Sequence, residues 1–136
     1  MTHESSSADL NAIASVREAW MKAVATGDAD ALHDFLAEDY EVWAHGAPPI
    51  KGPDGAVAAM KGALQRFRVE QRFVPLETVI CGDWAFERGI EHMTVTPIAG
   101  GPPQNASQRA LLILRRDADG RWRYARGMTN GLPKTD

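Results

Sequence analysis

The sequence predicts an α+β fold in which three N-terminal helices pack on a strongly curved antiparallel sheet and form a cone with one open end. Apolar residues recur at helical spacing through the first half of the chain, up to Phe67. From Val69 onward the pattern becomes strand-like, with Gly82-Asp83 and Asp119-Gly120 as tight turns. A cone of this kind is a container, so we expect a pocket for a small molecule.

The first two helices follow from apolar residues spaced three and four positions apart. Gly27 ends the first helix, and Asp28 begins the second, because an aspartate side chain can cap a helix N-terminus. The apolar side of the first helix consists of Leu10, Ile13, Val16, Trp20 and Val24, and that of the second consists of Leu32, Phe35 and Leu36.

A short strand and a third helix come next. Tyr40 to His45 is predicted as the strand, and the Gly- and Pro-containing segment 46–49 ends it. Gly52-Pro53 opens the third helix, since the missing N–H of proline costs nothing in a first turn. The buried side of this helix consists of Ala56, Val57, Met60, Leu64 and Phe67.

The remaining strands are consecutive, so a meander is the simplest topology. Pro75 is expected to interrupt or bulge the first of them, and Ile98–Ala106 forms a loop before the third. The predicted strands are Val69–Cys81, Trp84–Pro97, Gln108–Arg116 and Arg121–Met128. Because segment 111–114 is apolar at every position, both faces of its strand need cover, and we expect a homodimer packed through the sheets.

Length and composition narrow the class of protein. A chain of 136 residues predicts one domain, placed at 9–131 between a frayed start at 1–8 and a tail at 132–136. The net charge is −3 and the basic residues are scattered, so the sequence does not indicate a nucleic-acid or membrane partner. The single cysteine, Cys81, and a polar start without a signal-peptide pattern predict a cytoplasmic location.

Four segments carry a family resemblance: an opening at 20–39 (Trp20, Ala23, Gly27, Asp28, Leu32 and FLAED), Gly52, GDWAFERG at 82–89, and DGRWRYARGMTN at 119–130. Together they resemble the nuclear transport factor 2-like superfamily, in particular its SnoaL-like branch and a related domain of unknown function. The resemblance implies a cystatin-like α+β roll. Because the superfamily includes isomerases, dehydratases, cyclases, hydrolases, transport factors and assembly domains, it does not choose a function.

Two positions depart from the family pattern. Relatives such as ketosteroid isomerase carry a carboxylate base at the end of the first short strand, which falls near Ala44 or His45 here. SnoaL-like relatives often carry an acid just before Met128, where this chain has Gly127. Both departures argue against transferring a known mechanism to this chain.

His45, Glu87 and Arg109 are the candidate catalytic residues. His45 ends a strand at the expected mouth of the cone and titrates near neutral pH, although a histidine bonded to loop backbone has the same pattern. Alternation puts Glu87 and Glu91 on one strand face and Arg88 on the other, and leaves open which is concave. An inward Glu87 suits proton transfer and could pair with Arg109, whereas an inward Arg88 would hold an anionic group. Glu87 and Arg88 could each instead be one half of a cross-strand ion pair.

The remaining candidates would bind a ligand. Asn130 could hydrogen-bond a ligand oxygen or simply cap the chain end. Apolar walls are typical of small-molecule pockets, and the candidates for this wall are Trp20, Trp43, Met60 and Met128, with Phe67 and Phe73 beside them.

Common cofactor motifs are missing from the sequence. It contains no phosphate-binding loop or dinucleotide fingerprint, and its histidines show no metal-ligand spacing, so we expect no cofactor and no metal. Combined with the resemblance, this favours a protein that binds a small apolar or carbonyl-containing molecule. It would be a cofactor-free acid/base enzyme of the isomerase, cyclase or dehydratase type, acting on a carbonyl-containing or polyketide-like substrate. The alternative is a non-catalytic ligand-binding or dimerisation module.

Overall fold

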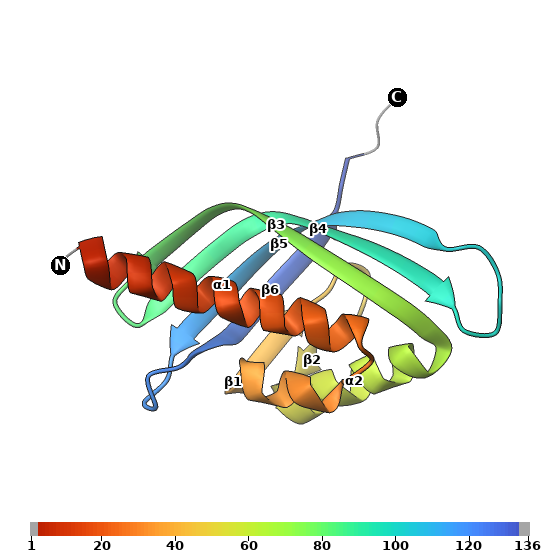
Figure 1. Cartoon of the computed structure of the whole chain (residues 1–136), viewed down its shortest axis with the longest axis horizontal. Coiled ribbons are helices and arrows are strands. Elements are labelled where there is room, and N and C mark those ends of the chain that lie inside the picture. Colours follow the sequence, from red (N-terminus) through yellow and green to blue (C-terminus); the bar gives the residue numbers. More distant parts are fainter. Residues whose placement is uncertain (1–2, 134–136) are drawn as a thin grey trace.

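The computed structural model describes residues 3–133, which form a helical layer against one strongly curved sheet (Figure 1). Helix α1 crosses the sheet, and η1 and α2 lie together beside its lower end. In chain order the elements are α1 (His3–Ala25), η1 (Asp30–Phe35), β1 (Leu36–Trp43), β2 (Ile50–Lys51), α2 (Gly52–Arg66), β3 (Phe67–Cys81), β4 (Trp84–Pro97), β5 (Gln104–Arg116) and β6 (Trp122–Gly131).

The sheet has the strand order β2-β1-β6-β5-β4-β3. Strands β3 to β6 form the predicted meander, with antiparallel neighbours throughout. The prediction of a wholly antiparallel sheet is wrong at one place, because β1 runs parallel to β6. This pairing places the first strand, β1, beside the last strand, β6.

The predicted set of three N-terminal helices is not confirmed. The second helix is a six-residue 3-10 helix, and α2 follows two strands rather than preceding the sheet. The local signals for the first boundary are nevertheless confirmed. Gly27 has a positive φ of 76° just after α1, and the Asp28 carboxylate accepts a hydrogen bond from the Ala31 N–H at 3.2 Å.

Register shifts accompany the bends of the long strands. One lies between Pro75 and Glu77 on β3, where a bulge was predicted, and another follows Ile113 on β5. Bulges increase local twist, which helps the sheet wrap around its contents. Beside the first bulge, a Cβ on Gly89 would lie 2.2 Å from the Val74 carbonyl oxygen, so only glycine allows this close approach.

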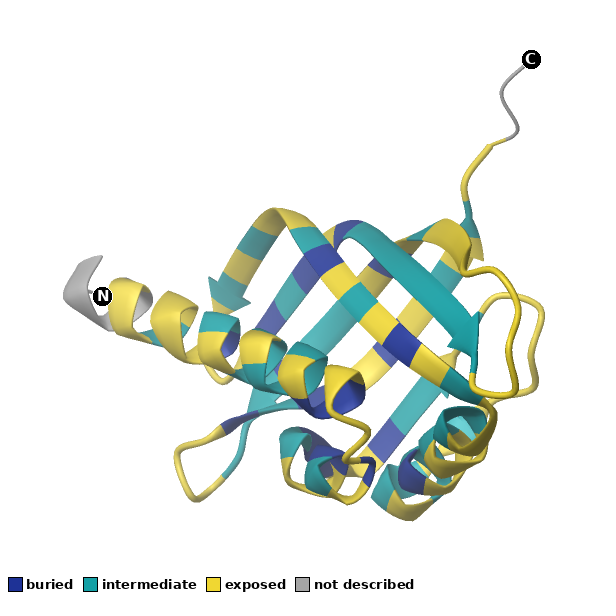
Figure 2. Ribbon diagram, turned by 45° about the vertical axis from the view of Figure 1, so that its right-hand side comes forward, coloured by how far each residue is buried: buried dark blue, intermediate teal, exposed yellow. Residues whose placement is uncertain are grey.

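The core lies between the helices and the inner face of the sheet (Figure 2). One buried cluster joins α1 to β1, β4, β5 and β6 around Ile13, Leu114 and Trp122. A second joins α1, η1, α2 and β3 around Val24 and Leu32. The helices therefore cover the concave face, and the outer face keeps no cover from the described residues of this chain.

The ends of the predicted elements differ in detail. Strand β5 begins at Gln104, inside the predicted loop, and α1 begins at His3, inside the segment predicted to be frayed. The boundaries at 9 and 131 stay predictions, since residues 1–2 and 134–136 lie outside the described residues.

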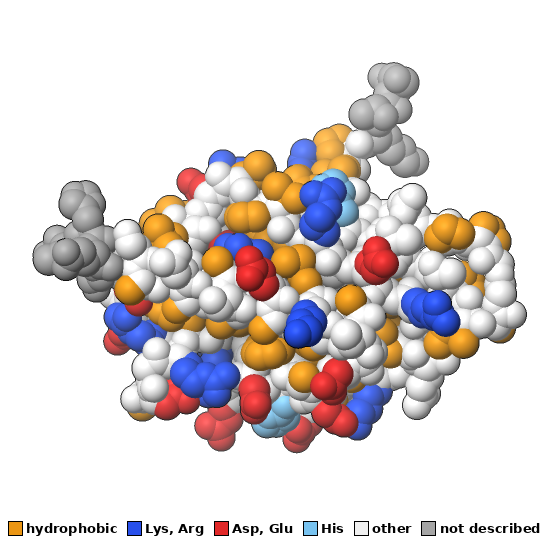
Figure 3. Space-filling model, viewed as in Figure 1, with side chains coloured by type: hydrophobic (Ala, Val, Ile, Leu, Met, Phe, Trp, Pro, Cys, Tyr) orange, Lys and Arg blue, Asp and Glu red, His pale blue; other side chains and the backbone are white. Residues whose placement is uncertain are grey.

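None of the helices in 3–133 is long and apolar enough to span a membrane. Charges of both signs are interspersed on the face seen in Figure 3.

Candidate functional site

Alternation along β4 decides which of its side chains face the helices. Glu87 is completely buried, whereas Arg88 is exposed and donates a hydrogen bond to Glu77 at 2.6 Å. Glu91 also points inward, since it shares the face of Glu87 and lines a cavity under the helices. The question that the sequence left open is thereby answered: the glutamates are on the concave face and Arg88 is outside.

The cavity lies between α1, α2 and the inner face of the sheet and has a volume of about 450 Å³. That is within the usual range for small-molecule sites. Its wall is largely apolar and includes three residues predicted for it, Trp20, Met60 and Phe73, together with Val42, Ala56 and Leu112. The polar groups in the wall are few: Arg17, Tyr40, Gln71, Glu91, Gln108, Tyr124 and Thr129.

Glu91 is the acidic group of this wall. Burial raises the pKa of its carboxyl above the ordinary value of 4.5, and a hydrogen bond from Gln108 acts in the opposite direction. The Gln108 Nε2 donates to Glu91 Oε1 at 2.7 Å, while Oε2 has no hydrogen-bond partner within residues 3–133. Glu91 is therefore a carboxyl held by one oxygen, with the other available to a ligand.

Two phenols face the same cavity. Burial raises the pKa of Tyr40 and of Tyr124 well above the ordinary value of 10, and the negative charges of Glu91 and Glu87, respectively, add to this effect. Both hydroxyls therefore stay protonated, and neither makes a hydrogen bond to another described residue. They are two available donors in an apolar wall.

The ring of Tyr124 is fixed from the helix side. Trp20 meets it edge to face, with ring centroids 5.7 Å apart and planes at 79°. The Trp20 indole N–H in turn donates to Gln71 Oε1 at 2.8 Å. Trp20 is thus both a wall residue, as predicted, and the support of a hydroxyl-bearing ring.

Glu87 forms a buried ion pair with a residue that sequence reasoning missed. Its Oε2 accepts hydrogen bonds from Arg17 Nη2 at 2.5 Å and from Thr78 Oγ1 at 2.7 Å. Glu87 Oε1 and Arg17 Nε are buried without a partner among the described residues. The predicted Glu87–Arg109 pair is wrong, because Arg109 lies opposite Ile90 on the outer face.

His45 lies on the loop after β1 and is exposed. Its Nδ1 accepts a hydrogen bond from the Gly131 N–H at 3.1 Å, and its own N–H donates to Thr129 Oγ1 at 2.9 Å. This is the backbone-bonded arrangement that the sequence left open. His45 is not part of the cavity wall, and the structure does not bring it together with Glu87.

Four other predicted site residues lie on the outer face with Arg88: Trp43, Met128, Arg109 and Asn130. Met128 is paired in register with Trp43 and with Leu111, and Trp43 and Met128 remain about half exposed, at 53% and 48%. Their predicted place in the cavity wall is wrong, since alternation sends Val42 and Thr129 inward instead.

The sequence did contain signals for the missed residues. Glu91 follows Glu87 at the period of one strand face, and Arg17 interrupts the apolar stripe of α1 between Ile13 and Trp20. Gly127 also points inward, but its Cβ position lies 3.1 Å from Val42 Cγ2. The family acid at that position would have little room, and β4 supplies the carboxylates of this interior instead.

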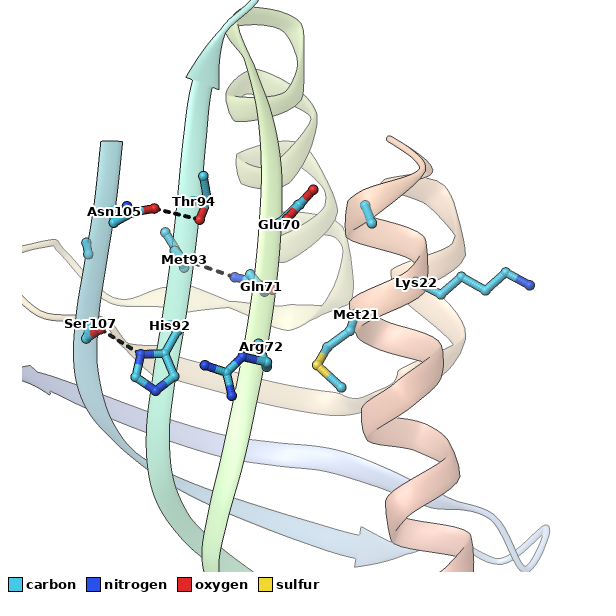
Figure 4. Close-up of a pocket in the computed structure, with 12 residues that line it drawn as sticks. Met21, Lys22, Glu70, Gln71, Arg72, His92, Met93, Thr94, Asn105 and Ser107 are labelled. Carbon is cyan, nitrogen blue, oxygen red and sulfur yellow. Dashed lines mark hydrogen bonds between the residues drawn. The ribbon is translucent and has the colours of Figure 1, made fainter. Parts of the chain in front are cut away.

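A second hollow of about 620 Å³ is lined by residues of α1, β3, β4 and β5 (Figure 4). Its side chains bond mainly to one another: His92 Nδ1 lies 2.7 Å from Ser107 Oγ, and Thr94 Oγ1 donates to Asn105 Oδ1 at 2.7 Å. It holds no buried polar atom without a partner among the described residues. We therefore place the candidate site in the apolar cavity. No group of three or more potential metal ligands occurs among the side chains that the structure describes.

A family model described as a SnoaL-like domain matches residues 17–125, which contain all these cavity residues except Thr129. The chain belongs to the SnoaL-like family. None of the curated proteins compared with it matches. The family match confirms the resemblance inferred from the sequence motifs.

Solved structures place this SnoaL-like chain in the nuclear transport factor 2-like fold. A conserved protein from Planctomyces limnophilus is 30% identical over 93% of this chain and 98% of its own, with a TM-score of 0.86. A ketosteroid isomerase-like protein from Erwinia carotovora is 25% identical over the same shares, with a TM-score of 0.79. A nuclear transport factor 2-like protein from Salmonella enterica, 13% identical over 91% of each chain with a TM-score of 0.76, shares the fold.

Proposed function

We propose that this SnoaL-like protein binds a small, largely apolar carbonyl compound in the cavity and catalyses cofactor-free proton transfer on it, as an isomerase, cyclase or dehydratase does. The observation that carries the proposal is Glu91: a carboxyl with a raised pKa and one free oxygen in an apolar wall. A raised pKa makes the carboxylate a stronger base and lets the carboxyl return the proton after the transfer. The ketosteroid isomerase-like relative supports this class of reaction.

The roles of the cavity groups follow from their protonation. The Glu91 carboxylate takes a proton from the carbon beside the carbonyl, and the electron pair of that C–H bond moves toward the carbonyl oxygen. The hydroxyls of Tyr40 and Tyr124 are protonated donors that stabilise the resulting oxygen charge. Glu91 then returns the proton to the product.

Hydrogen exchange tests Glu91 without knowledge of the natural substrate. The probe is 2-tetralone, a bicyclic ketone whose α-hydrogens exchange with D₂O and are followed by NMR. We expect the wild type to accelerate exchange and Glu91→Gln to remove most of the acceleration, a loss of about 10²-fold or more. Glu70→Gln, an exposed glutamate on the outer face of β3, is the matched control. Equal acceleration by Glu91→Gln and the wild type would show that Glu91 is not the base.

We also propose that two copies pair through the outer face of the sheet. Its centre carries Trp43, Leu111 and Met128, which are neighbours in register and 42–53% exposed. An apolar patch of this kind is typical of an interface. Sedimentation of the wild type is expected to give a dimer and that of Leu111→Glu a monomer, with Ile98→Glu in the exposed loop as control. A monomeric wild type would overturn this proposal.

The alternative is a non-catalytic ligand-binding or dimerisation module. It would be favoured if ketones bind in the cavity and the wild type gives no exchange above background. For location we propose the cytoplasm, supported by the exposed free thiol of Cys81, which suits a reducing compartment. Cell fractionation with detection of the full chain checks it, and recovery from an oxidising compartment would contradict it.

A further inference from the structure

We propose that Arg17 is an anion anchor of the cavity, so that the ligand carries a carboxylate at the end remote from the carbon that reacts. This inference rests on the proposed binding of a ligand in the cavity and adds the chemical class of that ligand. It comes from the buried Arg17–Glu87 pair, which the proton-transfer scheme does not use.

Arg17 has donors that the protein leaves free. Its Nη2 is bonded to Glu87, and its Nε is buried without a partner among the described residues. Its Nη1 makes no hydrogen bond to any residue whose side chain is described, and the Arg17 side chain lines the cavity while only 15% exposed. A guanidinium is always charged and presents a planar fork that fits a carboxylate.

Glu87 orients Arg17 without occupying the whole fork. Its Oε2 is shared between Arg17 and Thr78, and its Oε1 has no partner among the described residues. The pair is therefore held by a single hydrogen bond rather than by the two parallel bonds of a bidentate pair. Glu87 and Thr78 fix the direction of the guanidinium, and Arg17 lines the cavity with a fork that Glu87 occupies only in part.

The spacing along β4 sets the shape of the ligand. Glu87 and Glu91 are four residues apart on one face, which corresponds to about 13 Å between their Cα atoms at 3.3 Å per residue. Between them lies Gly89, whose Cβ position is 2.9 Å from Phe73 Cζ. An anion on Arg17 and a reacting carbon at Glu91 thus belong to opposite ends of the ligand. The fitting class is a flat apolar ring system with a carboxylate at one end and a carbonyl at the other.

Such an arrangement gives Arg17 a binding role at a distance from the chemistry. Contacts with a remote group can hold the reacting carbon against the base and raise the rate through orientation. Arg17 therefore discriminates between ligands, whereas Glu91 acts on whichever ligand is bound. The two roles can be tested separately, because the role of Arg17 is measured by binding affinity and that of Glu91 by the rate of hydrogen exchange.

The test compares two probes of nearly equal shape, 2-naphthoate and 2-naphthamide, by calorimetric titration of the full chain. We expect the wild type to bind the carboxylate at least tenfold more tightly, the effect of about one charge-assisted hydrogen bond. The main variant is Arg17→Met/Glu87→Gln, because Arg17→Met alone would leave a buried carboxylate without its cation. The control is Arg88→Met, an exposed arginine on the outer face of the same sheet.

Loss of the carboxylate preference in the double variant, with the preference intact in Arg88→Met, supports the inference. Equal affinity of the wild type for both probes, or a preference that survives in the double variant, overturns it and leaves the Glu91 proposal standing. Failure of both probes to bind at millimolar concentration overturns ligand binding in the cavity, and this inference with it. If the double variant is not folded by circular dichroism, Arg17→Lys takes its place. It keeps the charge without the fork and is expected to reduce the preference, and an unchanged preference would count against the fork.

Discussion

Glu87 and Glu91 face the same way from one strand, yet their surroundings differ completely. Glu87 is bonded to a cation and a hydroxyl and has no exposure, whereas Glu91 has only an amide partner and borders the cavity. The raised pKa of Glu91 results from burial without a positive neighbour to oppose it. Burial alone therefore does not decide what a carboxylate can do, because its hydrogen-bond and charge partners differ from one buried site to the next.

The largest expected effect comes from breaking the structural pair. Glu87→Ala removes the counter-charge of Arg17 and leaves a largely buried guanidinium with no hydrogen-bond partner among the described residues, so we expect the free energy of unfolding to fall by about 3–5 kcal/mol. Urea denaturation followed by circular dichroism measures it. Arg17→Met/Glu87→Gln is the matched comparison and should lose much less. A loss below about 1 kcal/mol for Glu87→Ala would mean that the pair is not buried as described.

The next effect concerns the position between the two glutamates. Gly89→Ala would place a methyl group 2.2 Å from the backbone oxygen of Val74, which cannot move as a side chain can. We expect a loss of about 1–3 kcal/mol or more in the free energy of unfolding, measured by the same denaturation.

The control is Gly62→Ala in α2, where a Cβ meets nothing within 4 Å. A helical glycine replaced by alanine should stabilise by about 0.5–1 kcal/mol. If the two variants have the same stability, the backbone of Val74 does not approach Gly89 as closely as described.

A smaller effect distinguishes Glu91 by its pH dependence. Its folded pKa is raised above the ordinary 4.5, so the folded state holds the proton more tightly than the unfolded state does. The wild type should therefore lose stability relative to Glu91→Gln as pH rises from about 4.5 through the raised pKa, by about 1.4 kcal/mol for each unit of the shift. Denaturation of both proteins across this range gives the difference. A difference that is constant with pH would contradict a raised pKa.

Much of the fold could be predicted because its signals are local. Gly27 ends α1, Asp28 caps the next turn and Pro75 adjoins a bulge, each for a reason contained in a few neighbouring residues. The parallel pairing of β1 with β6 could not be predicted, since it joins segments about ninety residues apart in the sequence and has no local signature.

The candidate site was predicted less well for the same reason. Alternation grouped Glu87 with Glu91, but the choice between them depends on Arg17, which reaches β4 from a helix seventy residues earlier. Trp43 and Met128 are apolar, as cavity-wall residues usually are, but they lie on the outer face of the sheet. Only the curvature of the sheet decides which of its two apolar faces is inside, and that is a property of all its strands together.

The smallest expected effect contrasts both glutamates with a surface carboxylate. Hydrogen bonds from Arg123, at 2.7 and 2.9 Å, and from the Arg121 N–H lower the pKa of Asp119 from 3.8 to about 2. Because the folded pKa is the lower one, the stability it contributes is present above pH 3.8 and is lost as pH falls to about 2.

Asp119→Asn should therefore lower Tm at pH 7 by less than Glu87→Ala or Gly89→Ala does, since water and salt screen an exposed pair. At pH 2 the difference from the wild type should shrink, because Asp119 is then almost fully protonated in the unfolded state and about half protonated in the folded state. Thermal unfolding at both pH values, in low salt and in 1 M salt, measures it. The same Tm difference at pH 7 and pH 2 would show that the Arg123 contact adds no pH-dependent stability. A result in the expected order would rank the three carboxylates by burial and partner together, with the ion-paired buried group first and the solvated pair last.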